Sequence, residues 1–295
     1  MAHAVTNRGQ FGQRRRARQD QEHQPQPQSR MAPSPWAGPV SDCPAGKLRG
    51  KVALIAGGDC GIGRAVAIAF AREGADIAVV YLNEHRGAEE TRRAILRENA
   101  RCILVAEDTA SEERCRRVIK RTIAAFGRLD ILVNNTAEQQ TPGQQPQGQQ
   151  PLADPQDVAP ERRERTLRTN LLGMFYLTKA AMPHLPTGGA IINTTAVTAW
   201  RDNTYLIDDD ATTAAIVSFT RSLAEAVIDR GIRANAVTPG PVGAPPIRAS
   251  FRSGSRWECA PAFGEIAPGY VSLAEQDGSF MTGRVVHAKA GETVG

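Results

Sequence analysis

Residues 51–64 read K-V-A-L-I-A-G-G-D-C-G-I-G-R, an apolar run followed by closely spaced glycines and then by the start of an amphipathic segment. This order of strand, glycine turn and helix cradles a pyrophosphate in dinucleotide-binding proteins. Gly57 permits the sharp turn, Gly61 lets the backbone approach the phosphates, and Gly63 lets the helix pack on the sheet. The stretch therefore predicts a dinucleotide site at the N-terminus of a helix.

The rest of the chain alternates strand-like and helix-like segments, which is typical of a parallel sheet covered by helices on both faces. Strands are expected at 51–57, 76–82, 102–106, 130–134, 190–195, 233–238 and 284–288. Helices are expected at 61–73, 86–99, 111–126, 160–184 and 210–230. The pattern predicts an α/β protein with a Rossmann-type doubly wound parallel sheet.

The charge of the chain is concentrated in its first fifty residues. They hold eight Lys and Arg against three Asp and Glu, which accounts for the formal net charge of +5 of the whole chain. We expect residues 1–46 to be a disordered tail rich in Gln, Pro and Arg, and residues 47–295 to form a single domain. The nearly neutral domain gives no support for specific nucleic-acid binding.

The spacing of the cysteines and histidines gives no sign of a metal-binding protein. The five cysteines show no C-x-x-C pair, and the five histidines show no metal-ligand spacing, so no metal site is predicted. No apolar run approaches the roughly 18 residues that span a bilayer, and no signal-peptide core precedes the domain. We expect a cytoplasmic protein without a membrane partner.

Two segments interrupt the alternation. Residues 139–151, Q-Q-T-P-G-Q-Q-P-Q-G-Q-Q-P, are of low complexity and follow the fourth expected strand. They either drape over a pocket mouth or form an insertion with no role. Residues 241–264 lack helical periodicity, although a substrate lid is expected at that place in folds of this kind.

Four sequence motifs follow one another along the chain, each occurring once. They are G-G-D-C-G-I-G-R-A-V-A-I-A-F-A, V-N-N-T-A-E-Q, L-T-K-A-A-M-P-H-L and M-T-G-R-V-V-H. From about residue 47 onward the chain resembles the short-chain dehydrogenase/reductase family, in particular its bacterial stress-associated, glucose/ribitol dehydrogenase-like branch. The resemblance implies an NAD(P)-binding oxidoreductase.

The resemblance also assigns roles to single positions. The cofactor-binding positions are the phosphate loop of Gly57, Gly61, Ile62 and Gly63, then Asp108 for the adenine amino group, Asn134 for the central sheet, and Pro239 and Gly240 beside the nicotinamide. Asn170 matches the helix Asn that holds a water in the family's proton relay. It is the only catalytic position that this chain retains.

The reaction centre departs from the family pattern. The family uses a Ser to hold the carbonyl, a Tyr to donate the proton and a Lys to lower the pKa of that Tyr. Here Ala196, Asp209 and Thr213 occupy these three positions. An unperturbed Asp has a pKa near ~4, so at neutral pH it has no proton to donate and its charge opposes an alkoxide.

Neighbouring residues do not replace the missing groups. Thr195 is one step from position 196, so along a strand its hydroxyl should face away, and Tyr205 has no Lys four residues later. The run Asp208–Asp210 suits the start of a helix, where carboxylates cap free N–H groups. The sequence thus predicts a chain that binds dinucleotide but is catalytically defective.

Two other functions stay open. One is an active NAD(P)-dependent oxidoreductase that acts on the CH–OH or carbonyl group of an aldehyde or sugar with a non-standard proton donor. The other is an oligomerising scaffold built on helices 160–184 and 210–230. In either case we expect a homo-oligomer, a dimer or a tetramer.

The choice of cofactor depends on the tip of the second strand. Tyr81 stands where an NAD site usually has an acid for the ribose 2′-OH. A 2′-phosphate would suit the nearby Arg64, Asn83, His85 and Arg86, whereas Glu84 could serve NAD. This surplus of basic side chains favours NADP(H).

Overall fold

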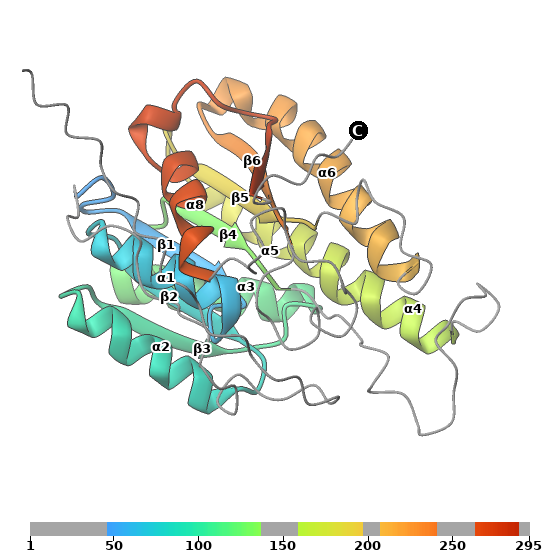
Figure 1. The fold of residues 1–295 in the computed structure, drawn as a ribbon, viewed down its shortest axis with the longest axis horizontal. Helices are drawn as coiled ribbons and strands as arrows, with labels where there is room; N and C mark the ends of the chain where they lie inside the picture. The colour runs from blue at the N-terminus through green and yellow to red at the C-terminus, as the bar shows by residue number, and fades with distance from the viewer. Residues whose placement is uncertain (1–45, 137–158, 197–206, 241–262, 289–295) are drawn as a thin grey trace, which may run out of the picture.

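The computed structural model describes residues 46–136, 159–196, 207–240 and 263–288. Within these ranges a seven-stranded parallel sheet has the order β3-β2-β1-β4-β5-β6-β7 (Figure 1). Its strands are β1 (Val52–Ala56), β2 (Asp76–Tyr81), β3 (Cys102–Ala106), β4 (Ile131–Asn134), β5 (Ala190–Thr194), β6 (Arg233–Pro239) and β7 (Val285–Ala288). The strand order reverses between β1 and β4, and such switch points are where open α/β sheets bind ligands.

The central strands are buried on both faces, as an all-parallel sheet requires. All five residues of β1, V-A-L-I-A, are buried, and so are all four of β4. Ala56 pairs with Asn134, so these two strands end at the same level. Their carboxyl ends therefore open together at the switch point.

Helices cover both faces of the sheet (Figure 1). They are α1 (Gly61–Arg72), α2 (His85–Arg97), α3 (Glu112–Phe126), α4 (Pro160–Leu167), α5 (Gly173–Ala181), α6 (Ile207–Val227) and α8 (Ala267–Ala274). Helices α1, α2 and α8 share one core with the sheet, in which Phe70 and Tyr270 are fully buried. Helices α3, α5 and α6 share the other core, around Ile119 and Leu177.

The segment expected to be one helix over 160–184 is divided. A π-helical turn, Arg168–Leu172, separates α4 from α5, and a 3₁₀ turn, Met182–His184, follows α5. At Gly173 a Cβ would lie 3.1 Å from the carbonyl oxygen of Thr109, so a glycine allows α5 to approach the loop after β3. The π turn carries Asn170, which is 2% exposed.

The predicted fold class is confirmed, since all seven expected strands are present and pair in parallel. Helix α8 was not predicted, and α6 begins at Ile207, earlier than the expected residue 210. The predictions for the tail up to residue 45, for 139–151, for Tyr205 and for 241–262 lie outside the described residues.

Candidate functional site

The glycine turn sits at the switch point and is hydrogen-bonded to the strands on both sides. The N–H groups of Gly57 and Gly58 donate to the carbonyl of Val80, at 2.9 and 3.3 Å, and the N–H of Asn135 donates to Ala56 at 3.2 Å. Gly57 has φ +72°, and a Cβ there would lie 3.0 Å from the carbonyl oxygen of Asn135. Glycine is therefore required by both backbone conformation and space.

The start of α1 is equally dependent on glycine. A Cβ at Gly63 would overlap the carbonyl oxygen of Gly57, so only a glycine lets the helix begin this close to the turn. Gly61 has φ +55°, and a Cβ added there would lie 3.8 Å from the ring of Phe263. Ile62 between them is half-buried. The three glycines predicted for the phosphate loop thus form one backbone cradle at the N-terminus of α1.

The region beside the tip of β2 holds the candidate ribose contacts. The Tyr81 hydroxyl lies 3.0 Å from Nδ1 of His85, and the two rings meet edge to face. His85 and Arg86 are exposed in the first turn of α2. Arg64, the other basic candidate near this tip, donates to the backbone carbonyls of Asp59 and Gly87. It therefore bridges the glycine turn and the first turn of α2.

Asp108 and Asn134 lie at the carboxyl ends of their strands, as predicted. The carboxylate of Asp108 accepts a hydrogen bond from the N–H of Ala110 at 2.9 Å, two residues after it. The amide of Asn134 donates to Thr178 at 3.2 Å and to Asn193 at 2.9 Å. Asn193 in turn donates to Thr220 at 2.9 Å. The side chains of Thr178, Asn134, Asn193 and Thr220 thus form a buried ladder of hydrogen bonds that runs from α5 across β4 and β5 to α6.

The positions of the missing reactive groups come together where β5 ends and α6 begins. Asp209 is 6% exposed, and its carboxylate accepts a hydrogen bond of 3.2 Å from the amide of Asn170. Thr213 is buried one turn further along α6, and its hydroxyl donates to the carbonyl of Asp210 at 2.9 Å. Ala196 follows β5 and contributes a methyl group. The structure thus brings Asn170 to the position expected for the proton donor.

Thr195 does not offer its hydroxyl to this site. Its Oγ1 donates to the carbonyl of Thr213 at 2.9 Å, and its N–H donates to Val237 at 3.0 Å. The side chain is therefore engaged by the backbone of α6. Pro239 and Gly240 are buried at the end of β6, where the N–H of Gly240 donates to Ala288.

The three consecutive aspartates lie in the first turn of α6, as the sequence suggested, but Asp208 has a different partner from the one expected. Instead of capping helix N–H groups, its carboxylate forms a bidentate pair with Arg162, at 3.0 Å for both bonds, and accepts from Thr166 at 3.0 Å. Because Arg162 and Thr166 belong to α4, this buried pair fixes α4 against the start of α6.

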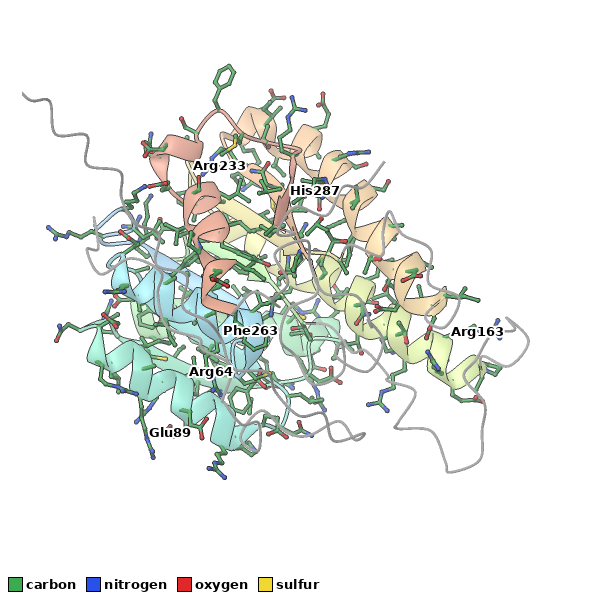
Figure 2. All side chains as sticks on the ribbon, viewed as in Figure 1. Arg64, Glu89, Arg163, Arg233, Phe263 and His287 are labelled. Carbon is green, nitrogen blue, oxygen red and sulfur yellow. The ribbon has the colours of Figure 1, made fainter. Side chains whose placement is uncertain are left out.

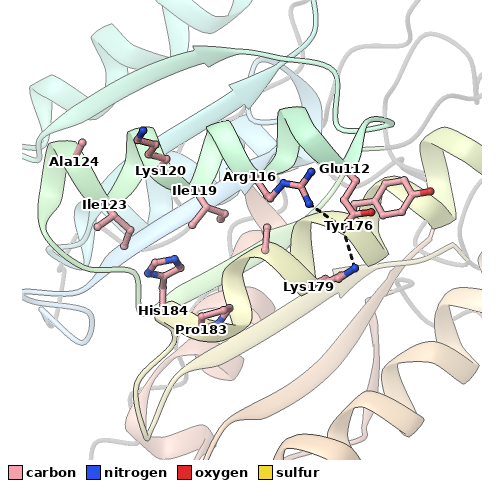
Figure 3. Close-up of a pocket in the computed structure, with 11 residues that line it drawn as sticks. Glu112, Arg116, Ile119, Lys120, Ile123, Ala124, Tyr176, Lys179, Pro183 and His184 are labelled. Atoms are coloured by element: carbon pink, nitrogen blue, oxygen red, sulfur yellow. Dashed lines mark hydrogen bonds and ion pairs between the residues drawn. The ribbon is translucent and has the colours of Figure 1, made fainter.

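A second concave region lies away from these residues. A surface groove of about 590 Å³ runs between α3 and α5, with Ile119 and Ile123 on its floor (Figure 3). Glu112 at its rim pairs with Arg116 at 3.2 Å and with Lys179 at 2.9 Å. None of the predicted site residues lines this groove.

The described residues hold no group of three or more His, Cys, Asp or Glu side chains suited to a metal ion. Among the helices in the same ranges, none has the length and apolar character needed to cross a membrane.

A parallel sheet with this strand order and a glycine cradle at its switch point defines a dinucleotide-binding protein of the doubly wound α/β class. A family described as enoyl-(acyl carrier protein) reductase matches residues 56–293. The chain belongs to the short-chain dehydrogenase/reductase family.

Three known proteins illustrate the relationship. The chain is 43% identical to general stress protein 39 of Bacillus subtilis (strain 168), over 94% of this chain and 96% of that protein. It is 39% identical to the glucose and ribitol dehydrogenase of Daucus carota, over 94% and 96%. A short-chain dehydrogenase from Burkholderia cenocepacia J2315, solved in complex with NADP, has a TM-score of 0.76 and 28% identity, covering 83% of this chain and 98% of that one.

Proposed function

We propose that this chain binds NAD(P)(H), with NADP(H) favoured, and that it is defective in carbonyl reduction. The single observation that carries the proposal is the buried Asp209 beside Asn170, because a carboxylate stands where the family's reaction needs a proton donor.

The backbone at the switch point fits the pyrophosphate of a dinucleotide. Gly57 and Gly63 let the turn pack closely against the start of α1, and Gly61 keeps a side chain off the N-terminus of that helix, where the helix dipole favours an anion. The NADP complex of the related Burkholderia enzyme supports the same class of ligand. Ile62, Asp108, Asn134, Pro239 and Gly240 are proposed to line the rest of the cofactor site.

The preference for NADP(H) rests on the first turn of α2. His85 and Arg86 are exposed there, beside the tip of β2, and the helix N-terminus adds partial positive charge. Glu84 precedes them and is the group that would favour NAD(H). Arg86 also pairs with Glu90 on the next turn, at 3.2 Å, so the preference for a 2′-phosphate rests on the exposure of His85 and Arg86 beside the tip of β2.

The cofactor would supply the hydride in a reduction, but the substrate oxygen would then need a proton and a hydrogen-bond donor. Ala196 has no donor, the carboxyl group of Asp209 accepts from the amide of Asn170, and the Thr213 hydroxyl donates to a carbonyl of its own helix. Loss of a general acid alone typically costs about 10²- to 10⁴-fold in rate. The proposed defect is therefore in the chemical step, with binding retained.

An active oxidoreductase for an aldehyde or sugar is the second candidate, and the name of the carrot relative favours a polyol or sugar. It would need another proton donor. Among the described tyrosines, Tyr270 lies nearest to the end of β5, with its hydroxyl 2.7 Å from Thr194. Burial raises the pKa of Tyr270 above its usual range, which makes it a poor acid at neutral pH.

The scaffold alternative has its own support. Leu167 of α4, Leu172 of the π turn and Phe175 of α5 expose 44%, 39% and 48% of their surface. A dimer or tetramer that covered them would remove apolar surface from water. We retain homo-oligomerisation as a proposal that is compatible with dinucleotide binding, and a cytoplasmic location remains a prediction.

Fluorescence titration of the purified chain with NADPH and with NADH tests the first half of the proposal. A turnover screen with aldehydes and aldoses, using both cofactors, tests the second half. Binding without turnover supports the proposal. Binding with turnover favours the active enzyme, and an oligomer that binds neither dinucleotide favours the scaffold.

A further inference from the structure

Arg64, in the first turn of α1, bridges two segments of backbone that are far apart in sequence. Its Nη2 donates to the carbonyl of Asp59 at 2.6 Å and to the carbonyl of Gly87 at 3.0 Å, and its Nε donates to Asp59 at 3.2 Å. Asp59 belongs to the glycine turn, and Gly87 belongs to the first turn of α2. One planar guanidinium therefore joins the turn that would hold the phosphates to the helix that flanks it. Figure 2 labels Arg64 where α1 lies beside α2.

Two further contacts show that this junction is closely packed. A Cβ at Gly87 would lie 2.8 Å from the carbonyl oxygen of Asp59, so a glycine is needed for the two backbones to meet. The hydroxyl of Thr91 donates to Gly87 at 3.1 Å and accepts from Nε of Arg64 at 3.0 Å. The side chain of Arg64 is only 16% exposed, and its Nη1 pairs with Glu90 at 3.4 Å.

The bridge determines which way one peptide group faces. In a trans peptide the C=O and the following N–H point in opposite directions. Because Arg64 holds the carbonyl of Asp59 towards α2, the N–H of Cys60 must face the other side of the turn. Cys60 is the N-cap of α1, so its N–H is one of those that a helix leaves without an intrahelical partner.

We propose that Arg64 is a positioning residue for the pyrophosphate: it holds the Asp59–Cys60 peptide so that the N–H of Cys60 faces the bound dinucleotide. This inference rests on the proposed function, because it concerns the same site. On this proposal Arg64 does not contact the 2′-phosphate of NADP(H). The contacts with that phosphate are assigned to His85 and Arg86. A lysine cannot replace it fully, since an ammonium lacks the planar fork that reaches both carbonyls.

The experiment compares wild type with Arg64→Met, Arg64→Lys and a matched control, Arg72→Met. Arg72 lies on the same helix and pairs with Glu98 at the other end of α2, 3.9 Å away. The first readout is backbone hydrogen exchange of the protein without cofactor, over residues 57–62 and 85–91. The second is the dissociation constant of NADPH and of NADH, measured by fluorescence.

In Arg64→Met we expect faster exchange in both segments, and both dissociation constants to rise by roughly 10- to 100-fold with their ratio unchanged. Arg64→Lys should recover part of the loss, and Arg72→Met should behave as wild type. Unchanged exchange or unchanged affinity in Arg64→Met overturns the inference. Weaker NADPH binding with NADH unaffected also overturns it, because Arg64 would then contact the 2′-phosphate. A wild-type chain that binds neither dinucleotide overturns the proposed function itself.

Discussion

The side-chain amide of Asn170 donates a hydrogen bond of 3.2 Å to the carboxylate of Asp209, joining the π-helical turn before α5 to the first turn of α6. The same amide lies 3.3 Å from the hydroxyl of Thr212, which donates to the carbonyl of Asp209. Asn170 therefore supplies a hydrogen-bond donor to the buried carboxyl group of Asp209, at the site where the family's relay would begin. Asp209→Tyr would remove the carboxyl group that accepts this hydrogen bond.

Restoring Ala196→Ser, Asp209→Tyr and Thr213→Lys together should create carbonyl reductase activity. We expect turnover to rise by at least about 100-fold over wild type, because a general acid and its partners act as a unit. Each single variant should do little, since a Tyr without its Lys keeps a pKa near ~10. Steady-state rates on aldehydes and aldoses with both cofactors provide the measurement.

Wild-type turnover of roughly 1 s⁻¹ or more would remove the reason to call the site defective. A triple variant that folds and binds cofactor but stays silent would show that more than these three positions has been lost. Circular dichroism and NADPH titration of the same preparations distinguish this outcome from simple misfolding.

Gly63→Ala should destabilise the fold, because the new methyl group would meet the carbonyl oxygen of Gly57. We expect a loss of about 1–3 kcal/mol in the free energy of unfolding, as for other overpacked sites. Gly269→Ala in α8 is the control, because no described atom lies within 4 Å of its added Cβ. Chemical denaturation measures both, and equal stabilities would contradict the close packing of α1 on the turn.

Gly61→Val should abolish dinucleotide binding while the chain remains folded. Gly61 has φ +55°, which a β-branched residue adopts only with strain. A change of that backbone moves the N–H groups at the start of α1. Unaltered NADPH affinity in a folded variant would refute this cofactor site.

Removing residues 1–45 should leave the melting temperature within experimental error, as expected for a tail without apolar periodicity. Leu48→Ala should instead cost about 2–5 kcal/mol, since this side chain is fully buried in the domain core. Thermal unfolding of the two variants checks both statements. A large loss on deletion alone would show that the tail packs on the domain.

Cys115 should resist alkylation in the native protein at about pH 8. It is fully buried, its Sγ lies 3.2 Å from the carbonyl of Thr109, and burial raises the pKa of its thiol to about 12. The thiolate that reacts is therefore absent well above neutral pH. Peptide mass spectrometry after iodoacetamide treatment, with and without denaturant, gives the comparison, and rapid native labelling would contradict the burial.

The fold could be predicted because strands such as β1 and β4 are short, apolar and bounded by glycine or polar residues. The division of the segment 160–184 could not, because a π turn needs one extra residue per turn and leaves no distinctive composition. Helix α8 was missed because it is short and contains Pro268 and Gly269.

Some residues of the candidate site could also be predicted from the sequence, whereas others could not. Gly57 and Gly63 could be identified because only glycine meets the backbone requirement, and that requirement is local in sequence. The partners of Arg64 could not be identified from the sequence. A basic residue near a ribose site predicts a contact with phosphate. Nothing in the sequence shows that the carbonyls of residues 59 and 87, 28 positions apart, both accept from Arg64.

The buried ladder from Thr178 through Asn134 and Asn193 to Thr220 has a consequence for how such a chain evolves. It anchors α6 to the sheet at Thr220, about two turns from residue 213 and about three from residue 209. Mutations at the reacting positions can therefore accumulate without loosening the helix that carries them. The proposed loss of the reaction would therefore leave the sheet and α6 held together by the same four side chains.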